Sequence, residues 1–207
     1  MSFLGFQETD FQTLDIDGLE PRMKAIQERI QPKFRAIGEE LASYLSDKLN
    51  QDMHLHIARH ARRTKNPPND TWVAFSHQKR GYKKHPHFQV GLWNDRVFVW
   101  LAFIYELPNK KEIAELFLRH QQELQKHIPH DYVISMDHMK KDTKQMDSDI
   151  LTYTLERFKT VKKSELLIGK QFAKTDPLVE NGEAFIHEVK AIFLKLSPIY
   201  QLAFKIV

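Results

Sequence analysis

The sequence has no cysteine among its 207 residues. Disulfide bonds, iron–sulfur clusters, thiolate zinc sites and cysteine nucleophiles are therefore excluded. No apolar run approaches the roughly 18 residues that a membrane-spanning helix needs, and the longest one, at 97–105, suits a buried strand. The first ten residues lack the basic and apolar regions of a secretory signal. We therefore expect a cytoplasmic protein that does not enter a membrane.

Signatures of several common enzyme classes are also missing. The sequence contains no G-x-S-x-G nucleophile elbow, no phosphate-binding P-loop and no dinucleotide-binding G-x-G-x-x-G. It does contain an ordinary share of hydrophobic residues, 42%, which supports a sizeable core. No repeat, low-complexity tract or linker divides the chain, so we expect a single domain over residues 1–207.

Charge is distributed unevenly along the chain. Overall, 31 Lys and Arg residues face 27 Asp and Glu residues, which leaves a mild net charge of +4. Residues 52–87 alone carry eight basic and two acidic side chains, together with six of the eleven histidines. Such a cationic, imidazole-rich segment in an otherwise nearly neutral chain indicates a binding surface for an anion.

Hydrophobic periodicity predicts a helix over residues 20–50, where apolar residues recur every three or four positions. Pro32 lies inside this pattern, so it either kinks one long helix or starts a second one. From 53 to 61 the period changes to two, which is typical of a half-buried strand. Residues 71–77 are rich in aromatic and β-branched side chains and predict a second strand.

The clearest local signal is Asn94-Asp95 between two apolar segments, because both residues tolerate the positive φ of a tight two-residue turn. The register follows from this turn, with residue 91 opposite 98. One face of the hairpin is then entirely apolar and must face the core; its residues are Phe88, Val90, Leu92, Val97, Val99 and Leu101. The second strand is apolar on both faces, which predicts a central position in its sheet.

The remainder of the chain continues the mixture of helices and strands. Helices are expected over 109–128, over 149–161 and from 182 to a break near Pro198. Short strands are expected at 132–136 and 165–172. Strands between helices, with a tight hairpin at 94–95, predict an α+β fold whose mainly antiparallel sheet packs against several helices.

Four long strings of the sequence stand out together: DIDGLEPRMKAIQERIQP at 15–32, HIARHARRTKNPPNDTWVAF at 56–75, KRGYKKHPHFQVGLW at 79–93 and DYVISMDHMK at 131–140. In these strings the chain resembles the YktB-like family of small cytoplasmic proteins from low-GC Gram-positive bacteria, and the resemblance extends over essentially the whole chain. It implies a single α+β domain. Because that family has no assigned function, the resemblance implies neither an activity nor a catalytic residue.

The histidines raise the question of a metal site. His54 and His56 are two residues apart, and His56 and His60 are four apart. In a helix, His56 and His60 could share a zinc ion, but in the strand inferred here they lie about 13 Å apart, which is too far for one ion. His54 and His56 are closer, yet the surrounding cations oppose a divalent metal. We therefore predict no metal site and no cofactor.

The arginine and lysine clusters favour an anion instead. Arg62 and Arg63 precede a rigid turn at 66–68, whereas Arg80 and Lys83 lie in a second loop. Guanidinium groups suit bidentate contacts to phosphate or carboxylate. The alternative is that these cations are solvated or pair with acidic side chains of nearby helices. If the strands form a simple meander, moreover, the two basic loops lie at opposite ends of the sheet, roughly 20 Å apart.

Two functions are consistent with these features. The first is a non-catalytic binding protein for a phosphate-bearing small molecule or a nucleic acid, with Tyr82, Trp93 and Trp100 available to stack on a base. The second is an enzyme acting on a phosphorylated substrate, with a histidine as general acid or base and arginines stabilising negative charge. A protein–protein scaffold is the third interpretation, and the oligomeric state is left open. The candidate ligand-binding residues are His56, His60, Arg62, Arg63, Arg80, Lys83, His87 and Gln89.

No catalytic residue is assigned at this point. Asp137-His138 is a dipeptide that could act as an acid–base couple, but such dipeptides are frequent by chance. An enzyme needs histidine and arginine side chains that converge in one pocket, whereas a binding protein needs only an exposed basic surface. The arrangement of these side chains in the fold therefore discriminates between the two functions.

Overall fold

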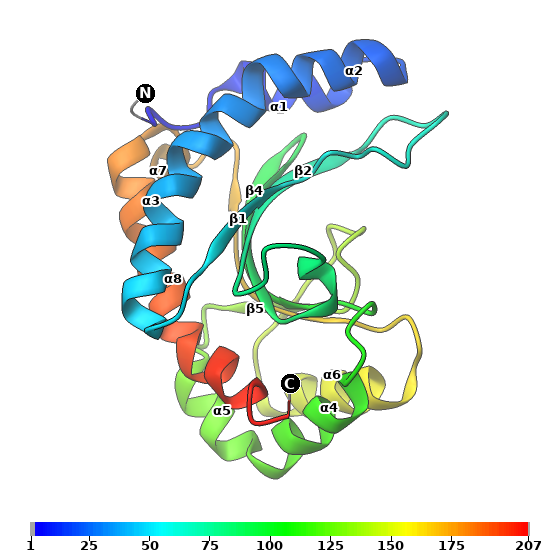
Figure 1. The fold of residues 1–207 in the computed structure, drawn as a ribbon, viewed down its shortest axis with the longest axis vertical. Helices are drawn as coiled ribbons and strands as arrows, with labels where there is room; N and C mark the ends of the chain where they lie inside the picture. The colour runs from blue at the N-terminus through cyan, green and yellow to red at the C-terminus, as the bar shows by residue number, and fades with distance from the viewer. Residues whose placement is uncertain (1–2, 207) are drawn as a thin grey trace.

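A seven-stranded sheet forms the middle of the structure, a computed structural model that describes residues 3–206 (Figure 1). The strand order is β1-β2-β3-β4-β7-β5-β6, and every neighbouring pair is antiparallel. The strands are β1 (His54–Ile57), β2 (Asp70–Ser76), β3 (His87–Trp93), β4 (Arg96–Phe103), β5 (Val133–Ser135), β6 (Lys144–Gln145) and β7 (Leu166–Ala173). The prediction of an α+β fold with an antiparallel sheet is confirmed.

Helices cover one face and the ends of this sheet. They are α1 (Glu8–Gln12), α2 (Leu19–Ala25), α3 (Gln31–Leu49), α4 (Lys110–Arg119), α5 (Gln121–His127), α6 (Ser148–Thr160), α7 (Pro177–Glu180) and α8 (Gly182–Ala203). Helix α3 packs against β1 and β2, α8 packs against β4 and β7, and α4 packs against α6. Figure 1 shows α3 and α8 side by side along one flank, with α4, α5 and α6 grouped at one end. Within residues 3–206, no helix combines the length and apolar character needed to cross a membrane.

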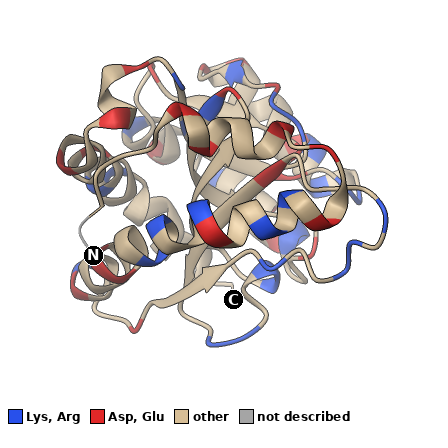
Figure 2. Cartoon of the chain, turned by 90° about the horizontal axis from the view of Figure 1, so that it is seen from above, with Lys and Arg blue, Asp and Glu red and all other residues tan. Residues whose placement is uncertain are grey.

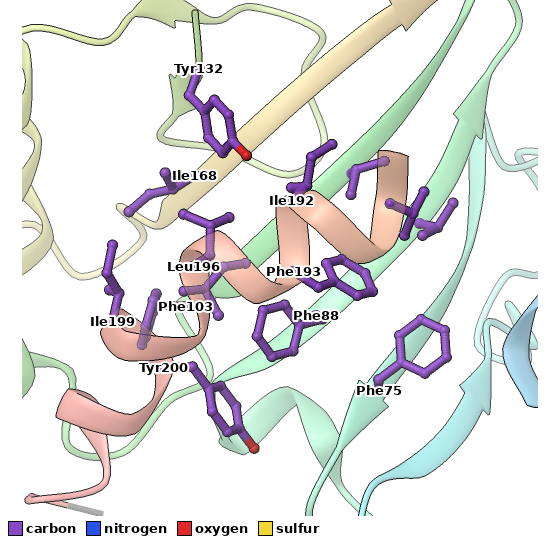
Figure 3. Close-up of a cluster of buried hydrophobic side chains, with 14 of the residues drawn as sticks. Phe75, Phe88, Phe103, Tyr132, Ile168, Ile192, Phe193, Leu196, Ile199 and Tyr200 are labelled. Carbon is purple, nitrogen blue, oxygen red and sulfur yellow. The ribbon is translucent and has the colours of Figure 1, made fainter. Parts of the chain in front are cut away.

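The main hydrophobic core lies between α8 and the strands. Figure 3 shows Phe193 and Tyr200 of α8 directed toward Phe88 of β3. The ring centroid of Phe88 lies 4.7 Å from that of Phe193 and 5.0 Å from that of Tyr200. All three side chains are fully buried. Burial of a large aromatic side chain contributes roughly 2–3 kcal/mol, so this layer fixes α8 on the sheet and leaves the opposite face of the sheet for other contacts.

The hairpin at 94–95 has the predicted register. Gly91 lies opposite Phe98, and the apolar partners Phe88 and Leu101 lie opposite each other, with both side chains at 0% exposure. Strand β4 is the central strand, flanked by β3 and β7. The alternation of side chains along β3 and β4 therefore determines which residues face the helices and which face away from them.

The face of the sheet that points away from α8 carries a second apolar cluster, built around Trp72, Trp93, Phe98 and Trp100. These rings are between 2% and 6% exposed. Loops rather than helices bury them. Tyr82 of the β2–β3 loop packs on the cluster, and Lys141 of the loop after β5 lies 5.7 Å from the Trp93 ring centroid. Loops that cover an aromatic floor are a common setting for a binding site.

Three details of the helices differ from the sequence predictions. The helix over 20–50 contains a π-helical segment, Ile26–Ile30, which ends two residues before Pro32. Proline cannot donate a backbone hydrogen bond. The helix over 109–128 is divided at His120. The break near Pro198 was wrong, because α8 continues through this residue to Ala203. Proline displaces the carbonyl four residues earlier, here that of Leu194, whose side chain is 48% exposed on the solvent side of α8.

Candidate functional site

A pocket of about 390 Å³ lies over the loop-covered face of the sheet. Five segments line it: residues 58–63, the β2 residues Asp70 and Trp72, residues 82–83, residues 105–106 and residues 138–139. We call it the Trp72 pocket. Its charged side chains include four cations and two carboxylates; they are Arg59, Arg62, Arg63, Lys83, Asp70 and Glu106.

The two basic loops meet in this pocket, although the strands form the expected meander of β1, β2 and β3. They meet because the β2–β3 loop folds back across the sheet instead of extending beyond its end. Gly81 takes a positive φ of 71° and starts the short 3-10 turn Tyr82–Lys84. The Trp72 indole N–H then donates a 2.8 Å hydrogen bond to the Tyr82 hydroxyl. The separation of roughly 20 Å expected for a meander therefore does not apply to Lys83.

Two predicted histidines hold this loop in place from below. The His56 ring stacks on Tyr82 with centroids 4.8 Å apart, and the fully buried His87 ring meets Tyr82 edge-on at 5.0 Å. His87 Nδ1 donates to the His85 carbonyl, and its Nε2 accepts a 2.8 Å hydrogen bond from the side-chain amide of Gln89. Burial lowers the pKa of His87 to about 3, so the ring is neutral near pH 7.

The cations of the basic segment have no carboxylate partner. Within residues 3–206, none of the eight Lys and Arg side chains of 52–87 has a charged nitrogen within 4.0 Å of a carboxylate oxygen. Arg62 is exposed, and Arg63 donates long hydrogen bonds to the carbonyls of Asn66 and Pro67. Lys83 lies 5.2 Å from the Trp72 ring centroid. The alternative of pairing with helix acids is therefore not seen in the described part of the chain.

Asp70 is the least satisfied group of the pocket. It is 1% exposed, and neither carboxylate oxygen has a hydrogen-bond partner within the described residues. Burial raises the pKa of Asp70 to about 6, against the opposing charges of His138, Arg63 and Lys83. Removal from water therefore outweighs these opposing interactions, and the carboxyl group gains or loses its proton at a pH just below neutral.

His60 contributes a neutral imidazole to the same wall. Its Nε2 lies 3.2 Å from the Thr71 hydroxyl, and its ring meets Trp72 edge-on at 5.5 Å. Burial, together with the charges of Arg63 and Lys83, lowers the pKa of His60 to about 4. His60 also has a positive φ of 50°, which is uncommon outside glycine and places strain at this corner of the loop.

A histidine–carboxylate pair that the sequence did not predict completes the pocket. His138 Nδ1 lies 2.8 Å from both carboxylate oxygens of Glu165, and the His138 backbone N–H donates to Glu165 Oε2 at 2.6 Å. Glu165 is 1% exposed and also accepts a hydrogen bond from the Tyr105 backbone N–H. Because Nδ1 carries the proton given to Glu165, Nε2 is left as the acceptor nitrogen.

The antiparallel pairing of two strands brings this pair together. His138 follows the end of β5, and Glu165 immediately precedes β7, so Ser135 lies opposite Leu167 and the Glu165 N–H donates to the Met136 carbonyl. The one signal in the sequence was the Asp137-His138 dipeptide. Its neighbour Asp137, however, is not the partner of the ring. The true partner lies 27 residues away across helix α6.

Asp137, His138 and Glu165 also offer three ligand atoms within 4.8 Å of one another, which is a spacing that suits a metal ion. These ligand atoms already take part in other contacts, however. Glu165 accepts hydrogen bonds from three N–H groups, and Lys140 Nζ lies 3.7 Å from Asp137 Oδ2. This hydrogen bonding accounts for the cluster without an ion, and the prediction of no metal site stays a prediction.

Seven of the eight candidate residues thus fall into two groups, and Arg80 belongs to neither. Four of them line the Trp72 pocket; they are His60, Arg62, Arg63 and Lys83. His56, His87 and Gln89 lie beneath it and support Tyr82. Arg80 is exposed and does not line the pocket. The site residues that the sequence did not single out are Asp70, Trp72, Tyr105 and Glu165.

Fold and site together define a class: an α+β protein whose antiparallel sheet is covered by helices on one face and by loops that enclose a basic pocket on the other. Residues 6–200 match the family model described as a domain of unknown function, DUF1054. The chain belongs to this family, in agreement with its resemblance to the YktB-like proteins.

Curated relatives extend over nearly the whole chain. The UPF0637 protein of Oceanobacillus iheyensis is 55% identical over 199 residues, which cover 96% of each chain. The UPF0637 protein of Shouchella clausii is 54% identical over 203 residues, which cover 98% of this chain and 96% of the relative. A third relative, from Listeria welshimeri, is 51% identical over 203 residues, or 98% and 99% of the two chains. The names of these relatives assign no activity.

Proposed function

We propose that this protein binds a phosphate-bearing molecule in the Trp72 pocket. The observation that carries the proposal is the convergence of Arg62, Arg63 and Lys83, three cations from two separate loops, with no carboxylate partner among the described residues. Cations placed together without partners repel one another unless an anion joins them. Phosphate matches a guanidinium fork with two parallel hydrogen bonds.

The pocket also indicates what accompanies the phosphate. Asp70 lies at the floor and has no hydrogen-bond partner among residues 3–206, so a ligand that donates a hydrogen bond there satisfies a buried carboxylate. The Tyr105 side chain is 45% exposed at the rim and offers an aromatic face. Hydroxyl or amino groups next to a phosphate, with a flat ring attached, are the features of a nucleotide. A volume of about 390 Å³ accommodates one such unit.

Figure 2 supports a surface of this kind, since the helices carry blue and red side by side whereas some long loops carry blue without red. The cations of residues 52–87, which have no carboxylate oxygen within 4.0 Å among the described residues, can attract an anion from solution. They contribute little to folding, because isolated surface charges are worth about 0–1 kcal/mol. Loss of a charge-assisted contact to phosphate, in contrast, costs about 1.5–3 kcal/mol of binding energy.

The test is a thermal-shift screen with nucleotides, sugar phosphates and oligonucleotides, followed by calorimetry on the best ligand. Arg62→Ala and Lys83→Ala should each weaken binding about 10-fold or more. Arg80→Ala is the matched control, because it removes an exposed cation from the same segment but outside the pocket. Equal loss of affinity in Arg80→Ala would mean that general charge, rather than the pocket, attracts the ligand.

Salt dependence separates the two kinds of ligand. The affinity for a nucleic acid should fall by close to one log unit per log unit of salt for each phosphate contact, whereas a mononucleotide should give a shallow slope. No binding by any phosphate-bearing compound, with all variants correctly folded, would contradict the proposal.

A further inference from the structure

His138 and Glu165 are not needed for the proposed binding, because Arg62, Arg63 and Lys83 already supply the positive charge. Their geometry instead resembles that of a positioned base. The Nδ1–H of His138 points to both oxygens of Glu165 at 2.8 Å, which fixes the orientation and tautomer of the ring. Glu165 is in turn held by the backbone N–H groups of Tyr105 and His138. The remaining ring nitrogen, Nε2, has no hydrogen-bond partner within the described residues, and His138 lines the pocket.

We propose that the Trp72 pocket is a catalytic site for RNA, in which His138, positioned by Glu165, takes the proton of a ribose 2′-hydroxyl next to the bound phosphate. This inference rests on the proposed function, since it requires that Arg62, Arg63 and Lys83 bind a phosphate. A phosphodiester of RNA carries its own nucleophile. It therefore needs a base to remove one proton and cations to stabilise the charge that develops on phosphorus, and both are present here.

The carboxylates around His138 suit this role. When the ring takes up a proton, the new positive charge lies against Glu165 through the hydrogen bonds, and it also acts on Asp70, whose pKa it lowers. Two carboxylates of low exposure, at 1% each, thus face the charge that the reaction would create. Fixed groups of opposite sign stabilise such a charge without reorganisation during the reaction.

A second basic hollow favours a polymer over a single nucleotide. It measures about 520 Å³ and lies on the other side of the 136–140 loop, with Asp137 in its wall while His138 faces the Trp72 pocket. Lys144 and Arg157 lie over the exposed ring of Tyr153, at 5.6 Å and 5.8 Å. Ser164, 4% exposed, also lines this hollow, and its hydroxyl has no hydrogen-bond partner in the described part of the chain. A single strand can place one phosphate in each hollow and stack a base on Tyr153 or Tyr105.

The reaction balances without another co-reactant. The 2′ oxygen forms a bond to phosphorus while its proton moves to His138 Nε2. The bond between phosphorus and the 5′ oxygen of the next nucleotide breaks, and that oxygen takes a proton from water in the pocket. His138 then returns its proton to the same water. The products are a 2′,3′-cyclic phosphate and a free 5′-hydroxyl.

The experiment uses the full chain and a short single-stranded RNA of mixed sequence, with product ends identified by mass spectrometry. We expect cleavage that leaves 2′,3′-cyclic phosphates. His138→Asn, which keeps an N–H for Glu165 but has no ring nitrogen to accept a proton, should slow cleavage by about 100-fold or more. Added imidazole should restore part of the activity of His138→Ala, a rescue that a purely structural role would not give.

His120→Asn is the matched control. His120, between α4 and α5, forms the same kind of pair with Glu123 at 3.0 Å, but at the surface and outside the pocket. This variant should cleave at the wild-type rate. No RNA cleavage by the wild-type protein, or equal cleavage by His138→Asn and the wild type in preparations of equal thermal stability, overturns the inference.

An analogue of the same strand with 2′-deoxyribose separates the two proposals. It lacks the nucleophile but keeps the phosphates. If it binds in a way that depends on Arg62 while the RNA is not cleaved, the binding function stands and the catalytic inference fails. If neither strand nor any mononucleotide binds, the binding function fails and the inference fails with it.

Discussion

Replacement of Asp70 by asparagine should stabilise the protein, although it alters the floor of the pocket. The carboxyl group is 1% exposed and has no hydrogen-bond partner among the described residues, so the folded state carries a buried charge above the pKa of this group. Burial raises that pKa to about 6 from an ordinary value of 3.8. Asparagine has nearly the same shape and no charge, and therefore removes the penalty.

The size of the effect follows from the shift. A pKa difference of about two units between the folded and unfolded states corresponds to about 3 kcal/mol, since each unit is worth about 1.36 kcal/mol. Because the pKa of Asp70 is higher in the folded than in the unfolded state, the folded state binds the proton more tightly. The stability is therefore greater below pH 4, and this gain is lost as the pH rises from about 4 to 6. Arg63, Lys83 and His138 face Asp70, and their opposing effect is already contained in the shift. We expect a gain of about 1–3 kcal/mol at pH 7.5.

Urea unfolding at pH 4 and pH 7.5 is the appropriate assay. Asp70→Asn should unfold at higher urea concentration than the wild type at pH 7.5 and at nearly the same concentration at pH 4. Asp52→Asn, at an exposed acid of the same segment, serves as control and should change stability by less than about 0.5 kcal/mol.

We also propose that the chain unfolds in one transition, as a single domain, because one hydrophobic cluster extends from Phe3 to Ala203.

A loss of stability in Asp70→Asn at pH 7.5 would refute the reasoning. It would mean that the negative charge of Asp70 has a favourable partner, such as a direct ion pair with Lys83 or Arg63 in solution. The same result with an unchanged pH dependence would show that Asp70 does not titrate near pH 6. Either outcome would also weaken the view that a ligand donates a hydrogen bond to this carboxylate.

Two further predictions concern pH and metals. Burial lowers the pKa of His87 to about 3, whereas it raises that of Asp70, so the contribution of His87 to stability is complete above pH 6.5 and is lost as the pH falls toward 3. His87→Gln should therefore make acid unfolding, followed by circular dichroism, less steep than in the wild type. Elemental analysis of the dialysed protein should find no stoichiometric zinc, and one zinc per chain would instead assign an ion to Asp137, His138 and Glu165.

Local patterns were sufficient for the central part of the fold. The turn at Asn94-Asp95 and the alternation along the flanking segments fixed the register of β3 with β4, because a shift by one residue would turn Phe88 and Val90 away from the core. The apolar character of both faces of β4 likewise placed it at the centre of the sheet. These features depend on residues close in sequence, where the steric and hydrophobic rules act directly.

Predictions at prolines and polar helix breaks were weaker, because tertiary contacts decide the outcome there. Pro198 should disrupt a helix by about 3 kcal/mol, yet α8 continues because residues on both sides of the proline, Phe193 and Tyr200 among them, are buried against the sheet. Pro32 did mark an irregularity, although the π-helical form of Ile26–Ile30 was not foreseen.

The candidate site was predictable in composition but not in arrangement. The charge of residues 52–87 pointed to the loops that line the pocket, and Arg62, Arg63 and Lys83 are among its wall residues. What brings them together is the hydrogen bond from Trp72 to Tyr82, which folds one loop back over the sheet. The pairing of His138 with Glu165 depends on β5 lying next to β7. Neither contact has a signature in the order of the residues.

The distribution of ion pairs gives the clearest reason to regard this face as the working surface. Outside residues 52–87, nine of the 23 Lys and Arg side chains lie within 4.0 Å of a carboxylate oxygen. Lys170 contacts Asp131 and Glu188 at 2.7 Å and 3.1 Å, and Lys190 contacts Glu40 at 2.7 Å. In residues 52–87 no basic side chain is paired within the described residues, and Asp70 is buried next to them without a partner. Cations that are gathered around one pocket without a carboxylate partner retain there the electrostatic attraction that a phosphate can use.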